Sequence, residues 1–350
     1  MQNDELNERE RNILRYIIQQ FISTASPVGS RNITKKYQLG FSPATVRNIM
    51  SDLEDSGYIG HPHTSAGRIP TDKGYRFYVD TLMDVQELMS SEKGLINKEL
   101  EINLSETAEL LNITSSLLSR ITKQLACVTY PKIDSGVLEK IQIVGLTSTR
   151  ILVVITIKSG FAQTITLEFS SDIKNSLLES VQRLLNERLS GLTLSKIRST
   201  FSERFKDVED DQKHIIRVFI DSADKIFKDT KQTDKLVITG TKNIIKQPEF
   251  DDAQKFQGII ELIEDKDFII HILEKSNELP YEKVFVSIGS ENKHQDLNEY
   301  SFVSKEYKLG DISGTLGIIG PKRMEYSKVV AIVDYMAKML SEVLTNNNSK

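Results

Sequence analysis

Residues 42–51 combine an arginine, an asparagine and several small side chains at helical spacing. Arginine can bond to guanine in a bidentate manner, and asparagine can do the same with adenine. Small side chains let a helix approach closely and touch a thymine methyl group. On a helix from 42 to 56 this set points outward, which predicts a helix that reads a DNA groove through Ser42, Ala44, Thr45, Arg47, Asn48 and Ser51.

The sequence marks the limits of this helix clearly. Ser42 can accept hydrogen bonds from the free N–H groups of the first turn, Pro43 fits the first helical position, and Gly57 suits a left-handed residue after the end. The apolar positions on the opposite face are Val46, Ile49, Met50 and Leu53. Alternatively, Arg47 and Asn48 are only solvated surface residues, but their setting favours the groove-reading role.

Two further helices are predicted ahead of it. Asn7 and Glu10 have the spacing of a capping box, and apolar residues then recur at helical spacing to about Ser23. A short helix from 30 to 37 follows, and a turn at 39–41 joins it to the groove-reading helix. This order is that of a helix-turn-helix, in which Ser30 and Arg31 would contact phosphates.

A small hairpin is predicted directly after the third helix. Residues 58–59 and 68–69 can pair as short strands around a loop that holds proline, serine and glycine. Such a wing lays backbone N–H groups and small or cationic side chains against phosphates or into the minor groove. The predicted wing contacts are His63, Thr64, Ser65 and Arg68.

A fourth helix begins after Thr71, which can cap it. Most of its aromatic residues are expected to pack inside, with Tyr75 and Arg76 as possible phosphate contacts. The nearby His61 and His63 lack the further cysteine or carboxylate ligands that a zinc site needs, so no metal is predicted.

Charge is distributed unevenly along the chain. The net charge is −4, yet between Thr24 and Tyr78 seven basic residues stand against four acidic ones, a balance of +3. Beyond residue 80 the balance is −5. This pattern predicts one small basic face on an acidic body.

Several classes of protein are disfavoured. No apolar run has the length of a membrane span and the N-terminus is acidic, so a cytoplasmic protein without membrane attachment is expected. Cys127 is the only cysteine and is interpreted as a buried apolar thiol. No catalytic motif is present, and Gly314, Gly317 and Gly320 are interpreted as turn and strand glycines; neither an enzyme nor a cofactor is predicted.

The rest of the chain predicts an α+β protein with further domains. After a DNA-binding domain at 1–83, residues 84–130 have a polar helical pattern typical of a linker. Residues 131–193 and 279–344 carry strand patterns at 141–146, 151–157, 161–169, 284–288 and 316–319, which we assign to one antiparallel-sheet domain. Residues 194–278, which are charged and mostly helical, are expected to be a subdomain inserted into it.

The N-terminal motifs resemble those of the bacterial HrcA family of heat-inducible transcription repressors. The likeness is dense over SPATVRN at 42–48, DLE at 52–54 and HTSAGRIPTDKGYRFYVD at 63–80, and it extends more weakly over the whole chain. Ile49 departs from the family, which often carries an acid there.

The resemblance implies a winged helix-turn-helix, then a GAF-like sheet domain interrupted by an inserted α/β dimerisation subdomain. It also implies a homodimer that binds double-stranded DNA at an inverted-repeat operator ahead of chaperonin and chaperone operons. The GroE chaperonin is the implied partner that keeps the repressor active.

Two other functions remain open at this point. The sheet domain could sense a small molecule, although residues 141–169 hold no recognisable polar constellation for one. The chain could instead be a chaperone-interacting scaffold whose winged helix contacts protein. Salt-dependent preference for a palindromic duplex over scrambled DNA separates a repressor from a scaffold.

Overall fold

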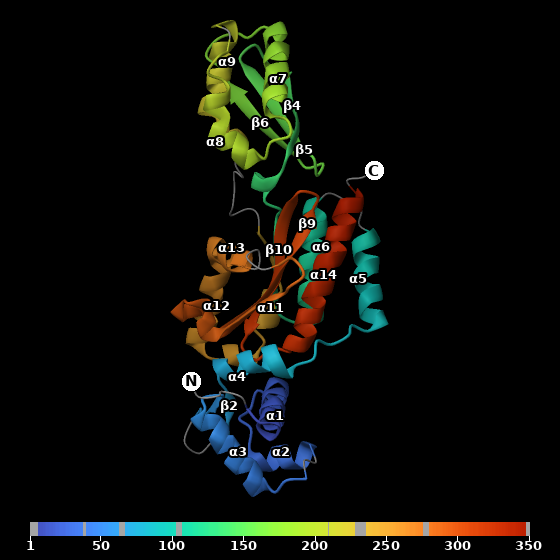
Figure 1. Cartoon of the computed structure of the whole chain (residues 1–350), viewed down its shortest axis with the longest axis vertical. Coiled ribbons are helices and arrows are strands. Elements are labelled where there is room, and N and C mark those ends of the chain that lie inside the picture. The colour runs from blue at the N-terminus through green and yellow to red at the C-terminus, as the bar shows by residue number, and fades with distance from the viewer. Residues whose placement is uncertain are drawn as a thin grey trace.

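The computed structural model describes residues 6–37, 40–62, 67–102, 107–208, 210–227, 236–275 and 280–347. Figure 1 shows an elongated molecule in three parts: a mostly helical N-terminal unit at one end, a central body around a five-stranded sheet, and a smaller α/β unit at the other end. Within the described residues, no helix is both long enough and apolar enough to cross a membrane.

The N-terminal unit consists of helices α1 (Glu8–Thr24), α2 (Ser30–Tyr37), α3 (Pro43–Asp55) and α4 (Asp72–Phe77), with strands β1 (Ile59–Gly60) and β2 (Ile69–Pro70) between α3 and α4. A short π-helical segment, Tyr78–Leu82, continues α4. Apolar side chains from α1, α2 and α3 form its core, including the fully buried Ile13, Ile17, Ile33, Val46 and Leu53.

Local signals define the ends of these helices as predicted. The Asn7 side chain accepts from the N–H groups of Arg9 and Glu10, and the Glu10 carboxylate accepts from the Asn7 N–H at 2.8 Å, a complete capping box. Gly57 has φ +77° after the end of α3. An antiparallel bridge between Val28 and Arg68 adds a third segment to the β1–β2 hairpin.

The central body has three layers. Its antiparallel sheet has the order β7 (Leu236–Thr239), β3 (Leu125–Thr129), β10 (Ile312–Pro321), β9 (Tyr300–Leu309), β8 (Phe285–Ile288). Helices α6 (Thr107–Thr122) and α14 (Tyr326–Asn347) cover one face, and α5 (Ser90–Ile102) packs outside them. Helices α11 (Thr241–Ile244), α12 (Ala253–Glu264) and α13 (Lys266–Leu273) lie on the other face, above a separate apolar cluster.

The α/β unit holds a second antiparallel sheet, β4 (Leu138–Gly145), β5 (Arg150–Ile157) and β6 (Ala162–Glu168). Helices α7 (Asn175–Leu189), α8 (Leu194–Arg204), α9 (Asp210–Asp221) and α10 (Ala223–Phe227) accompany it. Ile151, Val153, Ile155 and Ile157 of β5 are buried, whereas Leu152, Val154 and Thr156 on the opposite face are half-buried. One face is therefore apolar and covered.

The structure groups the strands differently from the division predicted from sequence. Strands β4–β6 were expected to share a sheet with the strands near 284–288 and 316–319, but among the described residues they pair only with one another. Helices α8–α10, from the predicted insertion at 194–278, accompany this sheet, whereas β7 and α11–α13 join the central body. The predicted helical linker 84–130 also contains β3, a fully buried central strand. Which strands pair depends on residues that are far apart in the sequence. The alternation of side chains along a single strand does not determine it.

Candidate nucleic-acid interface

Helix α3 has one buried face and one exposed face. Val46, Met50 and Leu53 are buried, and Ile49 is partly buried against the same core. On the other face Ala44, Arg47, Asn48 and Ser51 are exposed, and Thr45 is half-buried. Within the described part of the chain, the side chains of Arg47 and Asn48 make no hydrogen bond or ion pair. The structure thus leaves the predicted groove-reading side chains accessible, with their hydrogen-bonding capacity unused.

The first turn of α3 is held by its cap. The exposed Ser42 Oγ accepts from the Thr45 N–H at 3.1 Å and lies 3.0 Å from Thr45 Oγ1. Pro43 occupies the first helical turn, as predicted. This cap fixes the position of Thr45 and sets the direction in which the start of the helix points.

Helix α2 presents further cations beside α3. Arg31, Lys35 and Lys36 are exposed, and Ser30 is half-buried at the first position of the helix. The Lys36 ammonium donates to Gln20 Oε1 at 2.5 Å, which ties α2 to α1. Arg31 and Lys35 make no side-chain hydrogen bond or ion pair with any residue that the structure describes, so both can approach a phosphate.

Ion pairs and a hydrogen bond connect the hairpin after α3 to that helix. Arg68 lies 2.7 Å from Glu54 Oε2 and 2.7 Å from His61 Nδ1, and His61 Nε2 lies 2.7 Å from Glu54 Oε1. Gly67 passes so close to Val28 that a Cβ there would lie 2.6 Å from the Val28 carbonyl oxygen. His63, Thr64 and Ser65, the other predicted wing contacts, lie outside the described residues.

The contact between Arg68 and Glu54 was not part of the sequence prediction. Arg68 was expected to contact phosphate, and its side chain is only 23% exposed and faces a carboxylate on α3. The acids near the end of α3 were visible in the sequence, but which one meets the hairpin depends on the turn between them. Arg68 is therefore first of all a link between the hairpin and α3.

Tyr75 and Arg76 face the central body. Tyr75 is 2% exposed, and its ring centroid is 5.9 Å from that of Tyr326 on α14. The Arg76 Nε donates to Glu291 at 2.7 Å, and its Nη2 donates to the Val286 carbonyl at 2.7 Å. This placement differs from the phosphate contacts predicted for both residues, because neither side chain is free to reach DNA.

Asp72 forms the other half of this contact. Its carboxylate accepts from the Ser290 N–H at 2.9 Å and pairs with Lys322 Nζ at 2.9 Å. Burial acts to raise the pKa of Asp72, but the bonds from Ser290 and Lys322 outweigh burial and hold the pKa below its ordinary value. We call this contact, formed by Asp72, Arg76, Ser290, Glu291 and Lys322, the clamp.

Gly289 makes room for the clamp. It has φ +53°, and a Cβ there would lie 2.4 Å from an Asp72 carboxylate oxygen. Beside the clamp, Arg323 pairs with Glu249 at 2.5 Å and donates to the Ile22 carbonyl of α1 at 2.7 Å. The N-terminal unit is thus fixed to the body by charged groups from both ends of the chain, which sets the direction in which α3 faces.

The described residues offer no metal centre: they contain no group of three or more histidine, cysteine or acidic side chains that could hold an ion. Cys127 lies in β3, fully buried, and burial raises the pKa of its thiol. A neutral, enclosed thiol is a poor nucleophile, consistent with the apolar role predicted for it.

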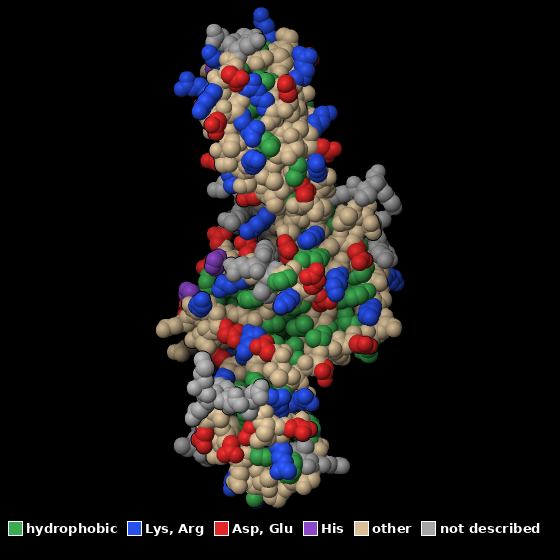
Figure 2. Space-filling model, in the orientation of Figure 1, with side chains coloured by type: hydrophobic (Ala, Val, Ile, Leu, Met, Phe, Trp, Pro, Cys, Tyr) green, Lys and Arg blue, Asp and Glu red, His purple; other side chains and the backbone are tan. Residues whose placement is uncertain are grey.

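Charge on the surface is mixed. Figure 2 shows lysine, arginine, aspartate and glutamate side chains scattered over all three parts of the molecule on that face. An interface with DNA on α2 and α3 would therefore draw on a few local cations rather than on a broad basic surface.

Comparison with known proteins gives a consistent result. Residues 108–330 match the family model described as HrcA protein C terminal domain. The chain is 42% identical to the heat-inducible transcription repressor HrcA of Chlorobium phaeobacteroides (strain BS1) over 97% of its length and 99% of that protein. It is 44% identical to the protein of the same name from Chlorobaculum parvum, over 98% of this chain and 99% of that one.

One solved structure is similar along nearly the whole chain. It is a crystal structure described as a hypothetical protein, with a TM-score of 0.59 and 24% sequence identity, covering 98% of this chain and 100% of the other. This likeness concerns the fold alone.

Proposed function

The chain belongs to the HrcA family of heat-inducible transcription repressors, and we propose that it represses by placing α3 in the major groove of an inverted-repeat operator as a homodimer. The family is one of transcription repressors, which is not an enzyme class. The N-terminal unit would act as a winged helix-turn-helix, with α2 and α3 as the helical pair and β1–β2 as the wing.

The accessible face of α3 is the observation that carries this proposal. Arg47 and Asn48 are exposed, have no partner within the described residues, and are flanked by the short side chains of Ala44 and Ser51. A helix with small residues beside an arginine and an asparagine can approach base edges closely, and the guanidinium and the amide can each make a bidentate contact.

Phosphate contacts would fix the register of this helix on the duplex. Arg31 and Lys35 on α2 have free cationic groups next to α3, and the cap at Ser42 leaves the start of α3 open. His63, Thr64 and Ser65 at the hairpin tip are proposed to add contacts to the sugar-phosphate backbone or the minor groove.

A dimer follows from the small charge of one DNA-binding unit. A local balance of +3 can neutralise only a few phosphates, so affinity well above that for non-specific DNA needs two units at fixed spacing. We assign the dimer contact to the α/β unit, whose sheet has a second face with no buried residue in β5. Leu152 and Val154 on that face are half-buried, and Val144 beside them is 48% exposed.

The remaining features of the proposal rest on the family. The central five-stranded sheet between helical layers is compatible with the GAF-like domain expected of the family. Support of the repressor by the GroE chaperonin is proposed for this chain on the same basis. On this view heat draws the chaperonin toward unfolded clients, the repressor loses its helper, and transcription rises.

The proposal is tested by footprinting the purified protein on the chaperonin promoter of its own organism, with and without the chaperonin. We expect two protected half-sites about one helical turn, or a multiple of it, apart, and stronger protection with the chaperonin. Equal affinity for the promoter and a scrambled duplex of the same length would contradict sequence-specific repression.

A further inference from the structure

A large cleft lies where the N-terminal unit meets the central body. It has a volume of about 1110 Å³ and is bounded by the C-terminal end of α6, the segment from β7 through α11, the start of α14, and Ile22 of α1. We call it the basic cleft because, among the residues that the structure describes, six cationic side chains and one acidic side chain, Glu325, line it. The six are Arg120, Lys123, Lys242, Lys246, Arg323 and Lys328.

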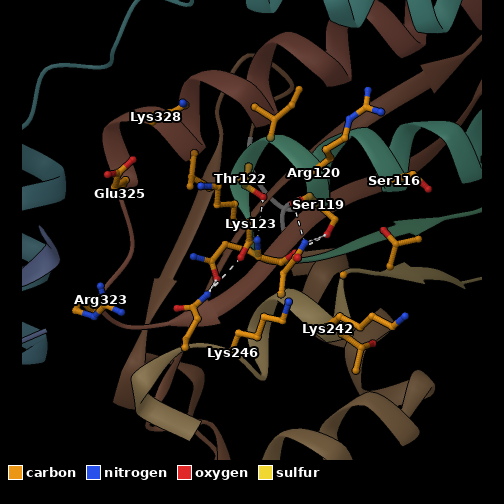
Figure 3. Close-up of a pocket in the computed structure, with 18 of the residues that line it drawn as sticks. Ser116, Ser119, Arg120, Thr122, Lys123, Lys242, Lys246, Arg323, Glu325 and Lys328 are labelled. Carbon is orange, nitrogen blue, oxygen red and sulfur yellow. Dashed lines mark hydrogen bonds between the residues drawn. The ribbon is translucent and has the colours of Figure 1, made fainter. Parts of the chain in front are cut away.

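Figure 3 shows that these cations come from three directions. Lys242 and Lys246 belong to the α11 region, and Arg120 and Lys123 to the end of α6. Arg323 precedes α14, and Lys328 lies in its first turn. The cations are therefore separated along the sequence, and the fold brings them together around one space.

Three of the six cations have acidic partners. Arg323 pairs with Glu249 at 2.5 Å, Lys328 with Glu92 at 3.1 Å, and Arg120 with Glu99 at 3.3 Å. The other three, Lys123, Lys242 and Lys246, are exposed and have no side-chain hydrogen bond or ion pair within the part of the chain that the structure describes. Gathering like charges without counter-charges is unfavourable, and a multiply charged anion would relieve it.

The walls of the cleft also offer apolar and neutral polar groups. Ile121, Ile238 and Val329 contribute apolar surface, and Ser116 and Thr241 contribute hydroxyl groups. A ligand site typically combines an apolar lining with a few polar groups in a volume of about 300–1,000 Å³. The cleft is slightly larger than this range and has these groups, so it has room and suitable chemistry for an organic molecule that carries phosphate groups.

We propose that the basic cleft binds a phosphorylated small molecule of nucleotide size that carries several negative charges. Lys123, Lys242 and Lys246 would bind its phosphates, and the isoleucine and valine side chains would contact its organic part. This assignment goes beyond DNA binding: Figure 1 shows α11 in the central body and α3 in the N-terminal unit below it, so a duplex on α3 need not enter the cleft.

The position of the cleft would connect its ligand to the DNA-binding unit. Arg323 lines the cleft and donates to the carbonyl of Ile22, which also lines it. A polyanion bound there would lie against the contact between α1 and the body, and could change how firmly α3 is held.

Titration calorimetry of the full-length protein at low salt tests the proposal, with ATP and inorganic tripolyphosphate as the probes. We expect micromolar binding of both, with ATP tighter because of its organic part. The triple variant Lys123→Gln, Lys242→Gln, Lys246→Gln should weaken binding by about tenfold or more. A matched variant with the same change of charge, Lys158→Gln, Lys174→Gln, Lys196→Gln, alters exposed lysines of the α/β unit and should bind normally.

The outcomes distinguish specific binding of the probes in the basic cleft from non-specific electrostatic attraction of an anion to the protein. The absence of binding by either probe, or equal losses in the two triple variants, overturns the proposal. If the wild-type protein binds neither probe and the cleft triple variant loses operator affinity, the three lysines contribute to DNA binding instead. That result also overturns the proposal. In the wild-type protein, ATP should protect Lys123, Lys242 and Lys246 from acetylation more than the three control lysines. Because these measurements need no operator, they can succeed or fail independently of the proposed repressor function.

Discussion

The guanidinium of Arg68 lies 2.7 Å from the carboxylate of Glu54, which joins the hairpin to the helix proposed to read DNA. His61 contacts both residues, at 2.7 Å in each case. The three side chains make the position of the hairpin depend on α3, so a change at either end should alter the wing contact proposed for the hairpin.

Breaking this ion pair should weaken operator binding without changing base preference. In a double-mutant cycle with Glu54→Gln and Arg68→Gln, we expect a coupling free energy of unfolding of about 0.5–1 kcal/mol, since both side chains are partly exposed. Chemical denaturation measures the coupling, and fluorescence anisotropy measures operator affinity. Additive effects on stability would show that the pair does not hold the hairpin.

Arg47→Ala should weaken the free energy of operator binding by about 1–3 kcal/mol and relax preference at one position in each half-site, because the proposed bidentate base contact would be lost. Arg31→Ala, a neighbouring exposed arginine on α2, is the matched control. It should weaken binding to all duplexes and reduce the salt slope by about 1. Binding to a set of single-base operator variants, at several salt concentrations, distinguishes the two. Equal, sequence-independent losses from both changes would remove Arg47 from base reading.

The difference between local and distant signals decides how much of this site the sequence could predict. Helix α3 was predicted with its cap, its end at Gly57 and its exposed face, because each depends on residues within a few positions of one another. The clamp was not predicted. Arg76 meets Glu291, a partner 215 residues away in the chain. From the sequence alone, an arginine on a short helix beside the predicted DNA-reading helices is equally compatible with a phosphate contact.

The same distinction explains the sheets. Strand patterns at 141–146, 151–157 and 161–169 correctly indicated β4, β5 and β6, but the pattern within one strand does not say which strands pair. Strand β3 has five consecutive buried residues, Leu125–Thr129, without alternation, and such a run cannot be told from a buried helix by periodicity. It was therefore included in the helical linker.

Gly289→Ala should loosen the N-terminal unit from the body. The added Cβ would lie 2.4 Å from Asp72, in addition to the strain at φ +53°. Gly191→Ala is a matched control, because φ is +82° there but no atom of the described residues lies within 4 Å of the added carbon. The free energy of unfolding of both variants should fall by about 1 kcal/mol because of backbone strain. Only Gly289→Ala should also speed proteolysis in the segment 83–89. Equal proteolysis of the two variants would show that the clamp tolerates the change.

Acid should weaken the clamp. The pKa of Asp72 is lower in the folded protein than its ordinary value of 3.8, so its stabilising contribution is present above that pH and is lost as the pH falls through the folded-state pKa. Asp72→Asn should lower the melting temperature at neutral pH and flatten its decline below about pH 4. Asp334, whose pKa is also lowered, pairs with Lys305 and is present in both the wild type and the Asp72→Asn variant. Its contribution to acid sensitivity is therefore the same in both melting curves. Parallel melting curves for the two proteins would exclude Asp72 as a source of acid sensitivity.

The open face of the β4–β6 sheet provides the test of dimerisation. Leu152 and Val154 are adjacent on that face, and their replacement in Leu152→Asp, Val154→Asp would place two carboxylates in the proposed contact. Buried charges without partners are strongly unfavourable, so we expect a folded monomer with little operator affinity. Phe256→Asp, at a large apolar residue of α12 that is 40% exposed, is the control and should remain a dimer. Light scattering gives the mass and anisotropy gives the affinity. A double variant that stays dimeric and binds the operator normally would place the dimer contact on another surface. A double variant that is monomeric yet binds the operator normally would show that two DNA-binding units at fixed spacing are not required.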